Sequence, residues 1–230
     1  FTRNMLQLNN SNLTFSEVGR FSGVEASDWS WGALFFDMNN DGLKDLFIAN
    51  GIYKDLTNQD YLKYISNEEV IQSIVKNNNQ LDYKKLIDII PSNKVKNHAY
   101  LNEGDLKFER VDNGLSTEGF SNGSAYGDLD NDGDQDLLIC REQGSDVRIL
   151  KNNGSGVFSA FASKSTGSNP QVIKAGYLNN DTLIDLVVVN KNQANISVIL
   201  GSSSYTHFGS TTNYLVALQP VDATINDFNN

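Results

Sequence analysis

Residues 125–139 read AYGDLDNDGDQDLLI. Aspartate occupies every second position from 128 to 136, a single glycine lies at 133, and an apolar run follows at once. Carboxylates held this close repel one another or take up protons unless a cation neutralises them. The stretch therefore predicts a bound cation at a tight turn just before a buried strand.

The spacing of the oxygen ligands favours calcium. Counted from residue 128, carboxylates fall at positions 1, 3, 5 and 9, glycine at position 6 permits a sharp turn, and position 7 offers its backbone carbonyl. Hard oxygen ligands without nearby histidine or cysteine indicate calcium rather than zinc or copper. The predicted ligands in this loop are Asp128, Asp130, Asp132, Asp134 through its carbonyl, and Asp136.

The same pattern occurs a second time near the start of the chain. The predicted ligands there are Asp37, Asn39, Asp41, Leu43 through its carbonyl, and Asp45, with Gly42 at the turn. An EF-hand would need a glutamate at position 12 and a following helix, whereas position 12 is Ile48 or Ile139 and strands follow. An Asp/Asn turn without metal is the alternative, but chance would not repeat the pattern with its glycine.

Two further copies of the loop are degenerate or cut short. In the third, Tyr177 replaces the first carboxylate and Thr182 the glycine, so we expect it to bind calcium weakly or not at all. In the fourth, Asp227 and Asn229 are followed by the last residue of the sequence.

The loops mark a repeat of about 50 residues. Their first positions, 37, 128, 177 and 227, are separated by 91, 49 and 50 residues. An aromatic residue after a polar turn gives a second landmark at Phe15, Phe108, Phe158 and Phe208, with intervals of 93, 50 and 50. Each unit contains short β-branched runs such as DLVVVN and a hairpin signal, VRILKNNGSGVFSAF. A repeated unit of about four short strands predicts an all-β protein, a partial β-propeller of about four blades, with a β-sandwich as the weaker alternative.

The long first interval contains residues of a different character. Residues 54–97 carry helical patterns, with Ser66 and Glu69 spaced as a capping box and Pro91 ending the last helix. We interpret them as a helical insertion into a loop of the propeller. It either covers one face of the propeller or binds a partner.

Composition restricts the partners. The chain has 230 residues, 39% of them hydrophobic, and a formal net charge of −10. Binding to nucleic acid or anionic lipid is therefore disfavoured. No apolar run approaches the roughly 18–20 residues of a membrane span, so these residues are not expected to insert into a membrane. The single cysteine, Cys140, is interpreted as a small buried thiol in a strand.

The units resemble FG-GAP/VCBS repeats, the calcium-binding blades of integrin α-subunit propellers and of many bacterial surface proteins. The first unit, with DWSWGALFFDMNNDGLKDLFIANG, is especially similar to the repeats of ASPIC/UnbV-type secreted proteins. The resemblance covers nearly all of the chain except residues 54–97. It implies a propeller of roughly six to eight blades, structural calcium sites at the two complete loops, and a location at the cell surface or outside the cell. It implies no single activity.

We therefore expect a non-enzymatic, calcium-stabilised binding module that recognises protein or glycan through propeller loops. Trp29, Trp31, Tyr53 and Tyr61 are candidate contacts, although packing within the blades is the simpler interpretation. An accessory subunit of a surface transport or adhesion assembly is one alternative. An extracellular polysaccharide-acting enzyme is another, which the absence of a Ser/His/Asp set and of metalloprotease motifs disfavours. We expect the 230 residues to be part of a longer polypeptide that supplies the remaining blades, with a complete four-bladed ring closed by the two termini as the weaker alternative.

Overall fold

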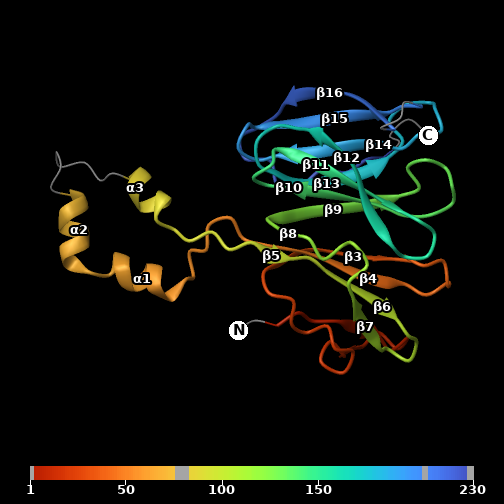
Figure 1. The fold of residues 1–230 in the computed structure, drawn as a ribbon, viewed down its shortest axis with the longest axis horizontal. Coiled ribbons are helices and arrows are strands. Elements are labelled where there is room, and N and C mark those ends of the chain that lie inside the picture. Colours follow the sequence, from red (N-terminus) through yellow and green to blue (C-terminus); the bar gives the residue numbers. More distant parts are fainter. Residues whose placement is uncertain (1–2, 76–82, 204–206, 227–230) are drawn as a thin grey trace. The chain divides into compact units, whose positions relative to one another are not determined.

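A computed structural model describes residues 3–75, 83–203 and 207–226 of the chain. The chain divides into two compact units, one formed by Phe1–Gly51 with Val95–Asn230 and the other by Ile52–Lys94. The first consists of β-sheets and the second of helices (Figure 1). No helix in the described ranges is long and apolar enough to cross a membrane.

The β unit contains three four-stranded antiparallel sheets, and none of them closes on itself in the described part of the chain. The first sheet is formed by β3 (Ser30–Phe36), β4 (Asp45–Asn50), β6 (His98–Asn102) and β7 (Phe108–Val111). The second is formed by β9 (Ser121–Gly127), β10 (Asp136–Arg141), β11 (Asp146–Asn152) and β12 (Phe158–Ser165). The third is formed by β13 (Pro170–Gly176), β14 (Asp185–Asn190), β15 (Asn195–Gly201) and β16 (Phe208–Leu215).

Two short sheets complete this unit. One pairs β1 (Gln7–Asn9) with β2 (Phe15–Glu17), and the other pairs β5 (Val95–Lys96) with β8 (Glu118–Gly119). The prediction of a β-rich repeat is confirmed. About four blades were predicted, and the described residues form three four-stranded sheets. The predicted fourth acidic loop, at Asp227, lies outside the described residues.

The second strand of each sheet is the centre of the core. β4 and β14 are buried along their whole length, and β10 is buried except for its last residue. In β10, Leu137 and Ile139 pack toward the first sheet, whereas Leu138 and Cys140 pack toward the third. Side chains alternate across a strand, so one strand supplies two cores and the sheets stack face to face. The predicted burial of the Cys140 thiol is confirmed, and burial raises its pKa.

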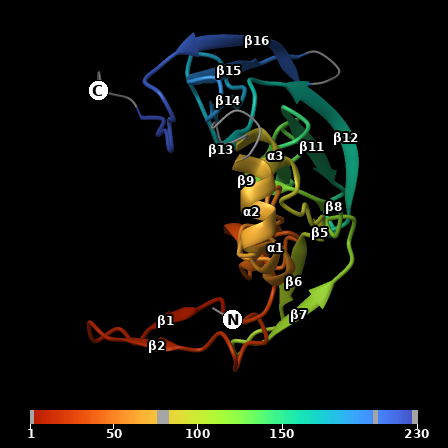
Figure 2. The same ribbon diagram turned by 90° about the vertical axis from the view of Figure 1, so that its left-hand side faces the viewer.

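The first strands of the sheets approach one another closely. β9 contacts both β3 and β13, and the three sheets follow one another in chain order (Figure 2). Gly32 of β3 and Gly123 of β9 each lie five residues before an acidic loop. A β-carbon at Gly32 would lie 2.9 Å from the carbonyl oxygen of Asn122, and one at Gly123 would lie 2.5 Å from that of Gln171. Both glycines therefore permit an approach that a larger residue would block.

The helical unit contains α1 (Gln59–Ile65), α2 (Glu68–Val75) and α3 (Tyr83–Asp88). The predicted capping box of Ser66 and Glu69 is wrong. Ser66 is the C-terminal cap of α1, and the side chain of Asn67 accepts the N–H groups of Glu69 at 2.9 Å and Val70 at 3.4 Å. Ser66 therefore ends α1, and the side chain of Asn67, one residue later, caps α2. Residues 95–97, expected within the insertion, belong instead to the β unit, where 95 and 96 form β5.

Candidate metal centre

Each four-stranded sheet carries an acidic loop between its first and second strands. The first acidic loop comprises residues 37–44, the second residues 128–135, and the third residues 177–184. The next strand begins in each case with an aspartate at position 9 of the pattern: Asp45, Asp136 and Asp185. The repeat therefore places three equivalent loops at the same point of three equivalent sheets.

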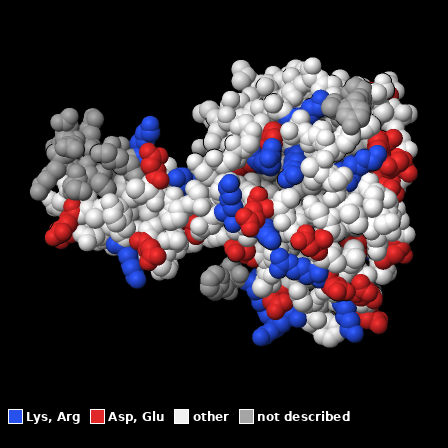
Figure 3. Space-filling view, in the orientation of Figure 1, with Lys and Arg blue, Asp and Glu red and all other residues white. Residues whose placement is uncertain are grey.

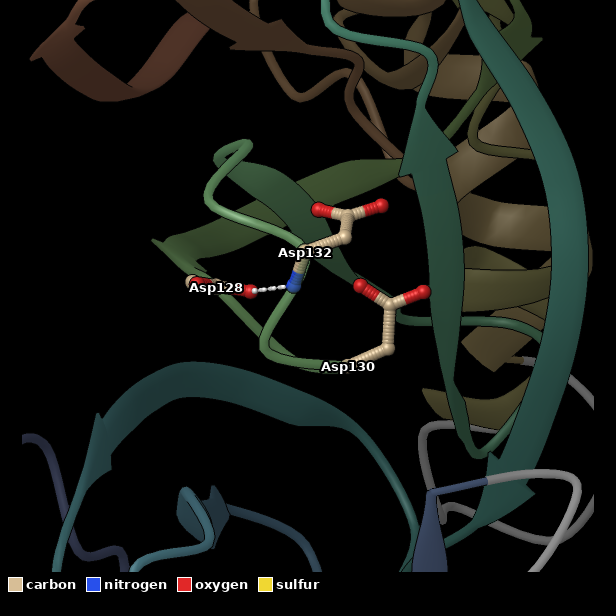
Figure 4. A group of neighbouring side chains, drawn as sticks. All are labelled: Asp128, Asp130 and Asp132. Atoms are coloured by element: carbon tan, nitrogen blue, oxygen red, sulfur yellow. Dashed lines mark hydrogen bonds between the residues drawn. The ribbon is translucent and has the colours of Figure 1, made fainter.

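The carboxylate at position 1 organises the first two loops. In the second loop, Asp128 accepts the backbone N–H group of Asp132 at 3.1 Å (Figure 4). It also accepts that of Gly133 at 3.0 Å. In the first loop, Asp37 accepts the N–H groups at the same two positions, at 3.1 and 2.8 Å. Gly42 and Gly133 have φ angles of 86° and 93°, in the left-handed region that favours glycine. These bonds wrap each loop around its first carboxylate.

The second acidic loop brings three carboxylates together. Oxygen atoms of Asp128, Asp130 and Asp132 all lie within 4.8 Å of one another, and the three residues form a group that could hold a metal ion. The side chain of Asp130 is only 10% exposed, and its Oδ1 atom is buried with no hydrogen-bond partner. A buried oxygen left without a partner costs free energy that a coordinated cation would offset. The donor set thus fits a hard divalent cation.

A lysine already lies beside this group. Lys151, in β11, forms an ion pair with Oδ2 of Asp130, and its Nζ atom lies 3.5 Å from Oδ2 of Asp132. Burial would raise the pKa of Asp130, but the hydrogen bond and positive charge of Lys151 outweigh it and hold this pKa below its usual value. The hydrogen bond that Lys151 donates to Asp130 in turn raises the pKa of Lys151. Both groups are therefore charged at neutral pH.

The position-9 aspartates fix each loop to its sheet. Asp136 accepts the backbone N–H of Leu129 at 3.3 Å and that of Asn152, at the end of the third strand, at 2.8 Å. Asp45 makes the equivalent pair of bonds at 2.8 Å each, and Asp185 does so at 2.7 Å each. Burial raises the pKa of Asp45, and raises that of Asp136 to about 6, against the opposing effect of these bonds. Each carboxylate oxygen keeps a second lone pair, so the bonds leave room for a metal.

The other predicted ligands take different places. In the described part of the chain, the group of carboxylates whose oxygens lie within 4.8 Å of one another does not include Asp134 or Asp136. It does not include the carboxylates of the first loop either. The side chain of Asp134 accepts a hydrogen bond from Asn40 of the first loop at 2.7 Å, which leaves its backbone carbonyl for the role predicted at position 7. Leu43, predicted to use its carbonyl, is a residue that is 40% exposed.

The third acidic loop has a different backbone. Neither Asn180 nor Thr182 has a positive φ angle, whereas Asn40 and Asn131, the counterparts of Asn180, have φ angles of 60° and 58°. Tyr177, at position 1, is 61% exposed. Without a carboxylate at position 1 and a glycine at position 6, this loop cannot wrap as the other two do.

Sequence reasoning missed two residues of the centre, Lys151 and Asn40. Lys151 lies just before the residue whose backbone N–H binds the position-9 aspartate. Its nearness to the acidic loop follows from the pairing of the strands, which the sequence alone does not give. Asn40 reaches a loop that lies 94 residues away in the chain. The only signal in the sequence was that Lys151 is charged, whereas the residues at the equivalent place in the other units are leucines.

Residues 128–181 match the family of the FG-GAP-like repeat. The matched segment begins at Asp128, the first predicted ligand of the second acidic loop, and runs into the third. An FG-GAP-like repeat is thus present in a β-rich chain. Comparison with curated proteins gave no match.

Proposed function

We propose that the three sheets are blades of a calcium-stabilised β-propeller. Three features support this: the sheets stack face to face, their first strands converge at Gly32 and Gly123, and the acidic loop lies at the same place in each. Stacked four-stranded meanders whose first strands converge are the arrangement of propeller blades.

In the second blade, Asp128, Asp130, Asp132 and Asp136, with the carbonyl of Asp134, would hold the calcium ion. The observation that carries the proposal is the buried Oδ1 of Asp130, unpartnered beside two further carboxylates. In the first blade the corresponding ligands are Asp37, Asn39, Asp41, Asp45 and the carbonyl of Leu43. Bound calcium would supply the positive charge that allows these oxygens to converge, so its binding free energy adds to the stability of the blade.

The test is thermal unfolding of the whole chain in calcium and in EGTA. At a calcium concentration about 100-fold above Kd, binding adds about 2.7 kcal/mol, which raises Tm by about 5–10 °C in a domain of this size. Asp130→Asn should reduce this shift, and Asp112→Asn, an exposed aspartate outside the acidic loops, should not. Equal Tm values with and without calcium would refute the proposal.

The function that this scaffold supports best is non-enzymatic recognition of a protein or glycan at a cell surface or outside the cell. FG-GAP-like repeats are typical of extracellular proteins, and millimolar calcium there fills even weak sites. Charges of both signs are mixed on the face of the β unit in Figure 3, so no single-sign area on that face favours a polyanion or polycation.

Trp31 is the aromatic residue best placed for such recognition. It is 56% exposed and lines a cavity of about 200 Å³ with Met5 and Phe35, which are 64% and 42% exposed. Binding to a glycan array and to cell-surface proteins, compared between the wild type and Trp31→Ala, tests this role. Unchanged binding by the variant would exclude it.

The helical unit supports docking to an assembly as a second candidate function. It is compact by itself, and both of its junctions with the β unit adjoin Gly119: Val95 pairs with this residue, and a β-carbon at Gly51 would lie 2.4 Å from its carbonyl oxygen. Ile52–Lys94 can therefore be replaced by a short Gly-Ser linker. Pull-down with and without this unit tests docking, and unchanged capture after the replacement would contradict it.

A further inference from the structure

The ion pair of Lys151 bears directly on the proposed calcium site, on which this inference rests. Lys151 contacts Asp130 and Asp132, two of the three carboxylates that could hold the metal. Its side chain is 37% exposed, whereas that of Asp130 is 10% exposed. The ammonium group thus reaches the buried carboxylate from the solvent side and can withdraw along its flexible stem.

The three sheets provide an internal comparison for this lysine. The residue whose N–H binds the position-9 aspartate is Asn152 in the second sheet, Asn102 in the first and Gly201 in the third. The residues just before them are Lys151, Leu101 and Leu200.

Position 3 of the loops varies in step with these residues. It is Asp130 in the second loop but Asn39 in the first and Asn179 in the third. The cation therefore occurs in the sheet whose loop carries the additional carboxylate, and leucine occurs where position 3 is neutral.

We propose that Lys151 is a tethered cation that holds Asp130 and Asp132 together in the calcium-free protein and competes with calcium for them. Calcium and the ammonium group need the same two carboxylates, and they repel each other at close range. Calcium binding at the second loop therefore requires Lys151 to withdraw. The second loop binds calcium more weakly than its five aspartates would by themselves, and it stays ordered when calcium is removed.

The experiment compares Lys151→Met, Lys151→Arg and Lys107→Met in the full chain. Lys107 is an exposed lysine in the turn between β6 and β7 of the first sheet, so its variant controls for the loss of one positive charge. Calcium affinity and stoichiometry are measured by isothermal titration calorimetry with calcium chloride, and Tm is measured in EGTA and in saturating calcium.

For Lys151→Met we expect calcium affinity at one site to rise by about tenfold or more, since one repelling charge is removed a few ångströms from the ion. Its Tm should fall in EGTA but equal or exceed the wild-type value in calcium. Lys151→Arg and Lys107→Met should behave like the wild type in affinity.

Two outcomes would overturn the proposal, and they distinguish its failure from failure of the calcium site itself. If the wild type binds calcium and Lys151→Met binds it equally, with Tm lowered alike in both buffers, Lys151 is only a structural ion pair. If neither protein binds calcium, the proposed calcium-stabilised function fails, and competition by Lys151 fails with it. Binding by Lys151→Met alone would support the inference.

Discussion

The side-chain amide of Asn40 donates a hydrogen bond to Oδ1 of Asp134 at 2.7 Å, and thereby joins the first acidic loop to the second. The contact is part of a wider junction, since the side chain of Asn152 donates to the carbonyl of Met38 at 2.8 Å. The two complete loops therefore lie side by side at the junction of two sheets. Ordering of one loop restrains the other.

Asn40→Gly tests this link without backbone strain, because glycine tolerates the φ angle of 60° at this position. Loss of this bond to a carboxylate, together with the longer bond from Asn40 to the carbonyl of Gly154 at 3.4 Å, should lower the free energy of unfolding by about 1.5–3 kcal/mol, measured by urea denaturation. Asn131→Gly is the matched control, since Asn131 occupies the same position of the second loop with φ 58°. Equal losses in the two variants would show that the link contributes nothing.

Asp185→Asn and Asp136→Asn separate the structural role of position 9 from metal binding. Asp185 is fully buried and accepts two N–H groups at 2.7 Å in a loop that lacks the position-1 carboxylate. Its replacement should cost about 2–4 kcal/mol, and the cost should be the same in calcium and in EGTA. Replacement of Asp136 should cost more in calcium than in EGTA. A calcium-dependent loss for Asp185→Asn would contradict this division of roles.

Local signals explain why the acidic loops and the strands after them could be predicted from the sequence. The run that begins at Asp136 is apolar on both faces, and the 50-residue repeat fixes its position in each unit. Lys151 and Asn40 were not predictable, because their partners depend on how strands pair and how sheets stack. The cap of α2 was misjudged because Ser66 and Asn67 are adjacent acceptors, and only the end of α1 decides between them.

His98 should make the protein sensitive to acid. It is 7% exposed in β6, with Nδ1 at 3.2 Å from the hydroxyl of Tyr100, and burial, aided by the charge of Arg110, lowers its pKa to about 4. The unfolded chain binds a proton near pH 6.5 and the folded chain does not. The contribution of neutral His98 to the free energy of unfolding is therefore complete above pH 6.5. As pH falls toward 4, the free energy of unfolding decreases by about 3 kcal/mol at most.

Urea denaturation of the wild type and His98→Gln between pH 4 and 7.5 measures this effect. The difference in unfolding free energy between the two proteins should shrink as pH falls through that window. Parallel curves for the wild type and His98→Gln would contradict the prediction.

The third acidic loop should gain calcium binding from two substitutions, Tyr177→Asp and Thr182→Gly. It already has Asn179, Asp181 and Asp185 where the first loop has an asparagine and two aspartates. Asn179 also accepts the N–H of Asp181 at 3.0 Å, a bond that the first loop makes at 3.3 Å.

The new carboxylate would accept the N–H groups at positions 5 and 6, and glycine would permit the left-handed turn seen at Gly42. The double variant should therefore bind one more calcium ion than the wild type in isothermal titration calorimetry. Each single variant should show no such gain, since the loop can wrap only when both changes are present. An unchanged stoichiometry in a double variant that keeps the wild-type Tm in EGTA would mean that these two positions do not determine binding.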